Sequence, residues 1–274
     1  MTAVLAASAE TGAERRPPKR RRRWPVATIA TFATTLLLWQ LASTLAWVSP
    51  VFLPPPAKVV AALGRLVTQG YVDSTLEQHA WASLSRVFLA LFFTILIAVP
   101  AGIVIGTSRI GRGILDPIIE FIRPLPPLAY LPLIIIWFGI GEPAKVLVIG
   151  LAMLAPIAIS TASGVRSAPQ SQVNAARSFG ATRAQILMHV LLPSALPEIL
   201  TGIRIALGAG WSTLVAAELV AASQGLGFMI ESAAQFLVTD VVLVGIFVIS
   251  ALAFAFEALL RLVERLFLPW ARHR

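Results

Sequence analysis

The sequence predicts an all-α polytopic membrane protein with about six transmembrane helices. Three observations support this fold class. Hydrophobic residues make up 57% of the 274 residues, charged residues make up only 13%, and the mean hydropathy is +0.83. Several apolar runs reach the roughly 20 residues that a helix needs to cross a bilayer. The alternating ten-residue strand pattern of a membrane β-barrel is not found in the sequence.

Residues 1–23 are polar and end in the basic run RRPPKRRRR, so we expect a disordered, basic cytoplasmic tail. Residues 24–274 are expected to form one transmembrane domain. Its first span is predicted over residues 25–48. Consecutive prolines follow this span and prevent the helix from continuing, and a mildly amphipathic stretch to about His79 is expected outside the membrane.

Five further apolar runs predict the remaining spans. They cover residues 82–106, 125–140, 144–164, 196–222 and 240–262. Four prolines between positions 124 and 132 rule out one regular helix there, so the third span is expected to have a broken cytoplasmic entry. Pro193 and Pro197 are expected to fix the angle at which the fifth span enters the membrane. An outer loop or short helix is expected over residues 223–239.

The distribution of charge predicts the orientation of these spans. Arginines gather in the tail, in the second-to-third and fourth-to-fifth connections, and at the C-terminus, whereas Asp73, Glu77 and Glu142 fall in the other connections. Basic connections stay on the cytoplasmic side of a membrane. We therefore expect both termini in the cytoplasm. The net charge of +9 is explained by topology and needs no nucleic-acid partner.

The connection before the fifth span, AARSFGATRAQILMHVLLPSALPEIL, is rich in arginine although the surrounding chain is suited to lipid. We expect a short helix over about residues 171–189 that lies across the cytoplasmic face. Ala175 and Ala176 permit another protein to approach closely, and Gly180 permits the backbone to turn. Such a helix can transmit rigid-body motion to the two spans that flank it.

The pattern formed by Ala175-Ala176, Gly180, Val190 and Leu192-Pro193 resembles the cytoplasmic loop signature of the permease subunits of binding-protein-dependent ABC importers. In that family the loop is a coupling helix that sits in a groove on the ATPase subunit. Asn174 replaces the usual glutamate, which removes a charge that could pair with the ATPase, and Val190 replaces the usual isoleucine. The residues that the resemblance places at the ATPase are Asn174, Ala175, Ala176, Arg177, Ser178, Phe179, Gly180, Ala181, Thr182 and Arg183.

Longer runs between about Phe52 and Trp270 resemble the nitrate, sulfonate and taurine branch of the same family. These runs are FLPPPAKVV, GILDPIIEFIRPLPPLAYLPLIIIWFGIGEPAK, PSALPEILTGIRIALGAGWSTLVAAELVAA, GLGFM and TDVVLVGI. The resemblance implies a type I ABC importer permease fold in a bacterial inner membrane. It also implies a homodimer, two ABC ATPase subunits that bind ATP and Mg, a substrate-binding protein outside the membrane, and taurine or a similar sulfonate as cargo.

The sequence offers no chemistry of its own for ATP hydrolysis. It contains three lysines and no Gly-Lys pair, so it has no P-loop to hold ATP phosphates, and it lacks hydrolase motifs and cysteine. The histidines His79, His189 and His273 are far apart, and surface positions are favoured over a metal site. We expect a transport component that is not an enzyme and holds neither cofactor nor metal.

Glu218 is the strongest candidate for function within the bilayer, because a carboxylate there must face protein or water. Two alternatives stay open for it, hydration near the outer interface and a role in holding helices together. Arg204 is a possible partner if another helix or a second subunit brings the two close. The candidate residues of a translocation path are Tyr130, Arg204, Trp211, Ser212, Thr213 and Glu218.

Two other classes of protein remain alternatives. An ion-coupled secondary carrier or channel would need its own coupling-ion residues, and Glu218 is the one obvious deep candidate. A membrane scaffold would show no substrate-dependent activity. Gly202, Gly208 and Gly210 give the fifth span a small-residue surface, which is consistent with either a subunit interface or packing inside the protein.

Overall fold

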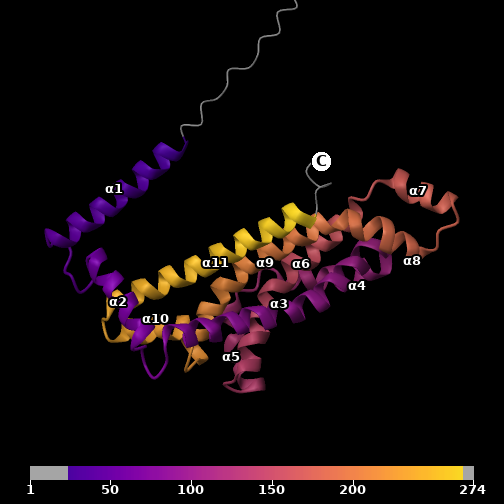
Figure 1. Cartoon of the computed structure of the whole chain (residues 1–274). Coiled ribbons are helices and arrows are strands. Elements are labelled where there is room, and N and C mark those ends of the chain that lie inside the picture. Colours follow the sequence, from indigo (N-terminus) through magenta and orange to yellow (C-terminus); the bar gives the residue numbers. More distant parts are fainter. Residues whose placement is uncertain (1–23, 268–274) are drawn as a thin grey trace, which may run out of the picture. The chain divides into compact units, whose positions relative to one another are not determined.

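The computed structural model describes residues 24–267, in which every regular element is a helix (Figure 1). The chain divides between Val48 and Ser49 into two compact units. The first unit contains α1, Trp24–Thr44, an uncharged helix of 21 residues. At 1.5 Å per residue α1 is about 30 Å long, which matches the hydrocarbon core of a bilayer. The predicted basic tail lies outside the described residues.

The second unit contains the long apolar helices. Four are long and apolar enough to cross a membrane: α3 (Leu76–Thr107), α6 (Glu142–Arg166), the run Arg183–Val220 that includes most of α9 (Leu192–Ala221), and α11 (Thr239–Phe267). Taken together as one bent segment, α4 (Arg109–Ile122) and α5 (Pro127–Phe138) are also long and apolar enough to cross, which gives up to five spans. Six spans require that α1 also crosses the membrane, and this crossing stays a prediction.

The second predicted span is confirmed, but its helix begins at Leu76 and not at Ala82. Thr75 and Gln78 form a capping box, in which each side chain accepts a hydrogen bond from the other residue's backbone N–H. The cap therefore starts the helix before the apolar run begins. The stretch to His79 that was predicted to lie outside the membrane is thus partly the first turn of α3.

The break predicted before the third span is confirmed, but residues 125–140 do not form a helix long enough to cross alone. α5 has 12 residues, or about 18 Å at 1.5 Å per residue, which is too short to cross alone. The chain bends by 102° between α4 and α5. The physical reason lies in the prolines, because Pro124 directly follows the residue that caps the end of α4, and Pro126 and Pro127 start α5.

The boundary of the fifth span also differs from its prediction. The predicted helix over residues 171–189 is two elements, α7 (Gln170–Ser178) and α8 (Arg183–Ile186). A π-helical turn, Leu187–Leu191, joins α8 to α9 without a break. Pro193 therefore does not set a re-entry angle, because it lies in the first turn of a helix that continues from the π-helical turn. The wider π-helical turn leaves room for the proline ring and does not need the backbone N–H that proline lacks.

The core of this unit is formed where α6 packs along both α3 and α9. Glycines permit this close packing. A Cβ on Gly102 of α3 would lie 2.5 Å from the Ala158 carbonyl oxygen of α6, and a Cβ on Gly202 of α9 would lie 2.5 Å from Ser160 Cβ. Gly202 and Gly210 thus serve packing within the protein, whereas Gly208 has open space around it. Large apolar side chains elsewhere on α3 and α11 stay exposed, as lipid-facing surfaces do.

The two ends of the second unit carry different short helices (Figure 1). At one end lie α2 (Pro56–Thr68) and α10 (Leu226–Gln235), and at the other lie α7 and α8. α10 confirms the short helix predicted over residues 223–239. An ion pair of 2.9 Å between Arg65 and Asp240 joins α2 to the start of α11, and the Thr239 hydroxyl donates to the Val51 carbonyl.

We predict that Gly102→Ala destabilises the protein by about 1–3 kcal/mol, because the added methyl group meets the Ala158 carbonyl and the Thr161 side chain. Gly64→Ala is the matched control, since a Cβ there has nothing within 4 Å and alanine favours a helix by up to about 1 kcal/mol. Thermal unfolding of the purified protein in detergent measures both. Equal melting temperatures for the two variants would contradict the close packing of α3 on α6.

Candidate functional site

The connection between α7 and α8 forms a defined turn at the end of the bundle. Gly180 has a φ of +79°, and the bonds from its N–H to Arg177 O (2.9 Å) and from Ala181 N–H to Ala176 O (3.1 Å) form the paired ending known as a Schellman motif. Thr182 and Gln185 then form a capping box that starts α8. Local signals in the sequence are thus sufficient to explain the turn.

The residues predicted to contact an ATPase follow this turn in order. Asn174 to Ser178 lie on α7, Phe179 to Thr182 form the turn, and Arg183 begins α8. Most of these residues are exposed, and Phe179 is the most prominent at 91% exposure. Asn174 accepts a hydrogen bond of 3.0 Å from Gln170 within the same helix. The turn therefore presents a large apolar side chain and a row of small residues outward.

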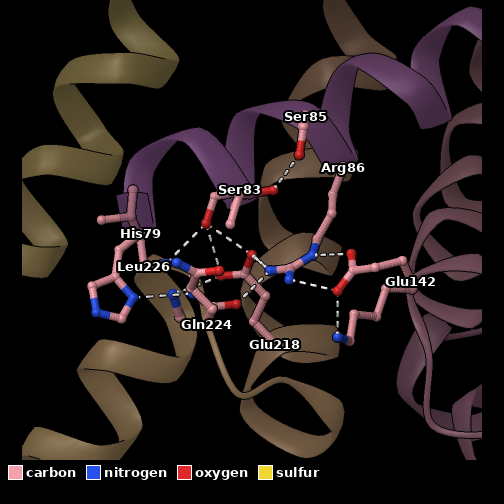
Figure 2. A network of polar contacts seen from close by, with 12 residues as sticks. His79, Ser83, Ser85, Arg86, Glu142, Glu218, Gln224 and Leu226 are labelled. Carbon is pink, nitrogen blue, oxygen red and sulfur yellow. Dashed lines mark hydrogen bonds and ion pairs between the residues drawn. The ribbon is translucent and has the colours of Figure 1, made fainter. Parts of the chain in front are cut away.

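A buried polar network lies at the opposite end of the unit (Figure 2). Its centre is the ion pair between Arg86 of α3 and Glu218 of α9, with 2.5 Å between Nη1 and Oε1. The Glu218 side chain has no exposed surface. The Ser83 hydroxyl lies 2.8 and 3.0 Å from its two carboxylate oxygens, and Gly227 N–H donates to Oε2 at 2.8 Å. Three donor groups from two neighbouring segments thus compensate the burial of this carboxylate.

Glu142 extends the network to α6. Its two oxygens accept from Arg86 Nε and Nη2 at 2.6 and 2.8 Å, and Lys145 Nζ lies 2.9 Å from Oε1. Two cations therefore face two carboxylates, so the cluster carries no net charge. Because Arg86 touches both carboxylates, it fixes the ends of α3, α6 and α9 relative to one another (Figure 2).

The turn before α10 closes over this cluster. Gly225 has a φ of +137°, and a Cβ on it would lie 2.5 Å from the Glu218 carboxyl carbon. Gly225 N–H donates to His79 Nδ1 at 3.1 Å, and His79 Nε2 lies 3.0 Å from Tyr71 O. Since Nδ1 accepts, Nε2 carries the proton and the imidazole is neutral. His79 is fully buried, so its predicted surface position is wrong.

The candidate path residues do not form one group. Tyr130, Ser212 and Thr213 line a cavity of about 310 Å³, whereas Glu218 belongs to the network described above. Arg204, considered above as a possible partner of Glu218, does not pair with it within the described chain. It lies 3.4 Å from Glu264 and 3.7 Å from Glu257 on α11, while Arg86 pairs with Glu218.

Trp211 also lies apart from the cavity, because it is buried against Phe256 with the ring centroids 6.1 Å apart. Sequence reasoning missed Arg86 and Ser83. A signal was present, since Arg86 is the one charged residue between Glu77 and Arg109 in an apolar run. Its partners could not be identified, because they lie in α6 and α9, far along the chain. The role of Glu218 in holding helices together, one of the open alternatives, agrees with these contacts.

We predict that Glu218→Gln lowers the free energy of unfolding by about 3–5 kcal/mol, because it leaves the Arg86 charge partly uncompensated in a buried site. Glu142→Gln is the comparison, since that side chain is 58% exposed and its loss is expected to cost about 1 kcal/mol or less. Chemical or thermal denaturation of the two variants measures the difference. Equal stability of the two would contradict a buried network centred on Glu218.

The sequence is similar to those of known transport proteins. A family model described as a binding-protein-dependent transport system inner membrane component matches residues 98–268. The taurine transport system permease protein TauC of Escherichia coli is 56% identical over 254 residues, covering 90% of this chain and 92% of that protein. The putative aliphatic sulfonates transport permease protein SsuC of Escherichia coli is 40% identical over 233 residues, covering 85% and 87%.

Solved structures agree in fold. A chain of the inward-facing MetNI methionine ABC transporter has a TM-score of 0.57 at 23% identity, covering 69% of this chain and 95% of that chain. A chain of an amino acid ABC transporter has a TM-score of 0.55 at 21% identity, covering 69% and 90%. The fold is that of an ABC importer permease, and the chain belongs to the family of inner membrane components of binding-protein-dependent transport systems.

Proposed function

We propose that the protein is the membrane-spanning subunit of an ATP-driven importer for taurine or a related small sulfonate. The observation that carries this proposal is the 56% identity to the taurine permease of Escherichia coli, which extends over 90% of this chain. The 40% identity to an aliphatic sulfonates permease supports the same class of cargo. The chain supplies the path, and the energy comes from separate ATPase subunits that bind ATP and Mg.

The assembly that we propose has two copies of this chain, two ABC ATPase subunits and a substrate-binding protein outside the membrane. Each ATPase contacts the turn between α7 and α8. The exposed Phe179 of the turn and the small residues Ala175 and Ala176 of α7 suit a surface that fits into a groove. Both termini lie in the cytoplasm, which puts this turn inside the bacterium and the Arg86 network at the outer end.

A continuous helical run supports coupling between the two ends. Residues 183–220 form a single span candidate of 38 residues, or about 57 Å at 1.5 Å per residue. This run begins at the proposed ATPase contact, passes Ser212 and Thr213 at the cavity, and ends beside Glu218. A displacement of α8 by the ATPase therefore moves the cavity wall, while the Arg86 ion pair holds the outer end.

The ion-coupled carrier finds less support. Glu218, the candidate for binding a coupling ion, is already neutralised by Arg86 and accepts from Ser83 and Gly227. A carboxylate with these contacts offers no free ligand for a cation. Uptake by this chain alone in liposomes under an ion gradient would nevertheless favour the carrier over the importer.

We predict that Gly180→Val lowers both ATPase co-purification and ATP-driven taurine uptake at least about tenfold. A β-branched residue at a φ of +79° is strained by roughly 1–2 kcal/mol or more, so the turn that presents Phe179 is distorted. Co-purification with the tagged permease and uptake by the reconstituted complex measure these losses.

Gly113→Val serves as the matched control for Gly180→Val. A Cβ added at Gly113 would have nothing within 4 Å, as at Gly180, but Gly113 has an ordinary helical backbone in α4. Its variant should keep the ATPase bound and taurine uptake near the level of the unmodified protein. If the Gly180 variant binds the ATPase and transports taurine as well as the Gly113 variant does, the turn is not the ATPase contact.

A further inference from the structure

The cavity of about 310 Å³ lies where the bend between α4 and α5 meets the middle of α6 and α9. Residues of the bend line it, including Ile122, Arg123 and Pro127. Irregular backbone inside a membrane is tolerated where it is covered by protein or lines a water-filled cavity. The break between α4 and α5 is therefore expected to border a polar cavity, because its backbone groups need protein or water as partners.

The polar groups of this cavity favour an anion. Arg123 is the one charged residue among the described lining residues, and within residues 24–267 its guanidinium has no hydrogen bond or ion pair. The Tyr130 hydroxyl likewise has no partner in the described chain. Both groups donate hydrogen bonds, and the guanidinium presents several N–H groups in a fixed plane that matches oxyanions.

The position of Arg123 makes a purely structural role costly. The cavity reaches Leu151 and Pro156 in the middle of the 25-residue α6. Arg123 borders the same cavity from the end of α4, and it is an exposed residue in the single chain. An arginine within a membrane-spanning segment is expensive in lipid and usually faces a cavity or a partner. On the opposite wall, the Ser212 and Thr213 hydroxyls already donate to α9 carbonyls at 3.3 and 2.9 Å, so Arg123 and Tyr130 are the donors that face the cavity without a partner in the described chain.

We propose that Arg123 and Tyr130 form a transient subsite for the sulfonate group of the cargo inside the membrane. This inference rests on the proposed function and adds its binding chemistry. The remaining walls, such as Leu151, Ala152 and Ala155, are apolar and suit a short alkyl chain. The described lining holds no carboxylate, so the subsite recognises the sulfonate and leaves an ammonium group unrecognised. Discrimination between taurine and unsubstituted alkanesulfonates then belongs to the substrate-binding protein.

The subsite is also placed to release its ligand when the transporter moves. Arg123 and Tyr130 come from the two arms of the α4–α5 bend, whereas Ser212 and Thr213 come from the long run that begins at the ATPase contact. Movement of that run relative to the bend changes the size of the cavity. Since two donors hold the anion and no closed cage surrounds it, binding stays weak enough for passage.

The test uses the complete complex of permease, ATPase and binding protein in proteoliposomes, with labelled taurine as the probe. Arg123→Gln is expected to lower taurine uptake at least about tenfold, because a charge-assisted hydrogen bond to the sulfonate is lost. Arg123→Lys keeps the charge and is expected to recover part of the uptake, and Tyr130→Phe is expected to lower it a few fold. Basal ATP hydrolysis takes place in another subunit and reports whether each variant complex is assembled.

Arg109→Gln is the matched control, since Arg109 at the start of α4 is exposed, as Arg123 is, but does not line the cavity. The inference is overturned if Arg123→Gln transports taurine as well as Arg109→Gln does. It is also overturned if Arg123→Gln loses basal ATP hydrolysis and Arg123→Lys recovers nothing, because that pattern indicates a structural role. Failure of the unmodified complex to import any sulfonate would overturn the proposed function itself.

Discussion

The buried ion pair between Arg86 and Glu218 is the interaction on which the arrangement of the long helices depends. Glu218 has no exposed surface, so its charge must be compensated inside the protein, and Arg86 provides this from a different helix. Glu142 and Lys145 then balance the cluster to no net charge. One end of the α3, α6 and α9 bundle is thereby fixed, which leaves the opposite end, with α7 and α8, as the part that a partner can displace.

This division of roles explains why the cavity lies between the two ends. A path through the membrane needs polar groups at mid-depth, but a permanently rigid or fully paired group there would trap or exclude an anion. In the Arg86 cluster each charged group has an ion-pair partner of opposite charge. The side chains of Arg123 and Tyr130 at the α4–α5 bend are unpaired within the described residues, and they border the helix run that begins at the proposed ATPase contact.

Sequence alone is sufficient where the signals are local. The apolar runs predict α3, α6 and α11, and Gly180 predicts the turn after α7. Sequence fails where tertiary geometry decides. Prolines show that a break follows α4 but not that the chain bends by 102° there, and a π-helical turn lets the helical run through α9 begin well before Pro193. Arg86 is visible as a lone charge, yet its partners depend on how distant helices pack.

The turn between α7 and α8 is the place where we propose that a separate ATPase acts on this chain. The chain has no cysteine, so a single cysteine introduced by Ser178→Cys can carry a photo-crosslinker at a defined place. In the reconstituted importer, illumination should join this residue to the ATPase, whereas Ser250→Cys on the exposed surface of α11 should not. A Ser178→Cys variant that imports taurine but forms no crosslink to the ATPase would contradict the account.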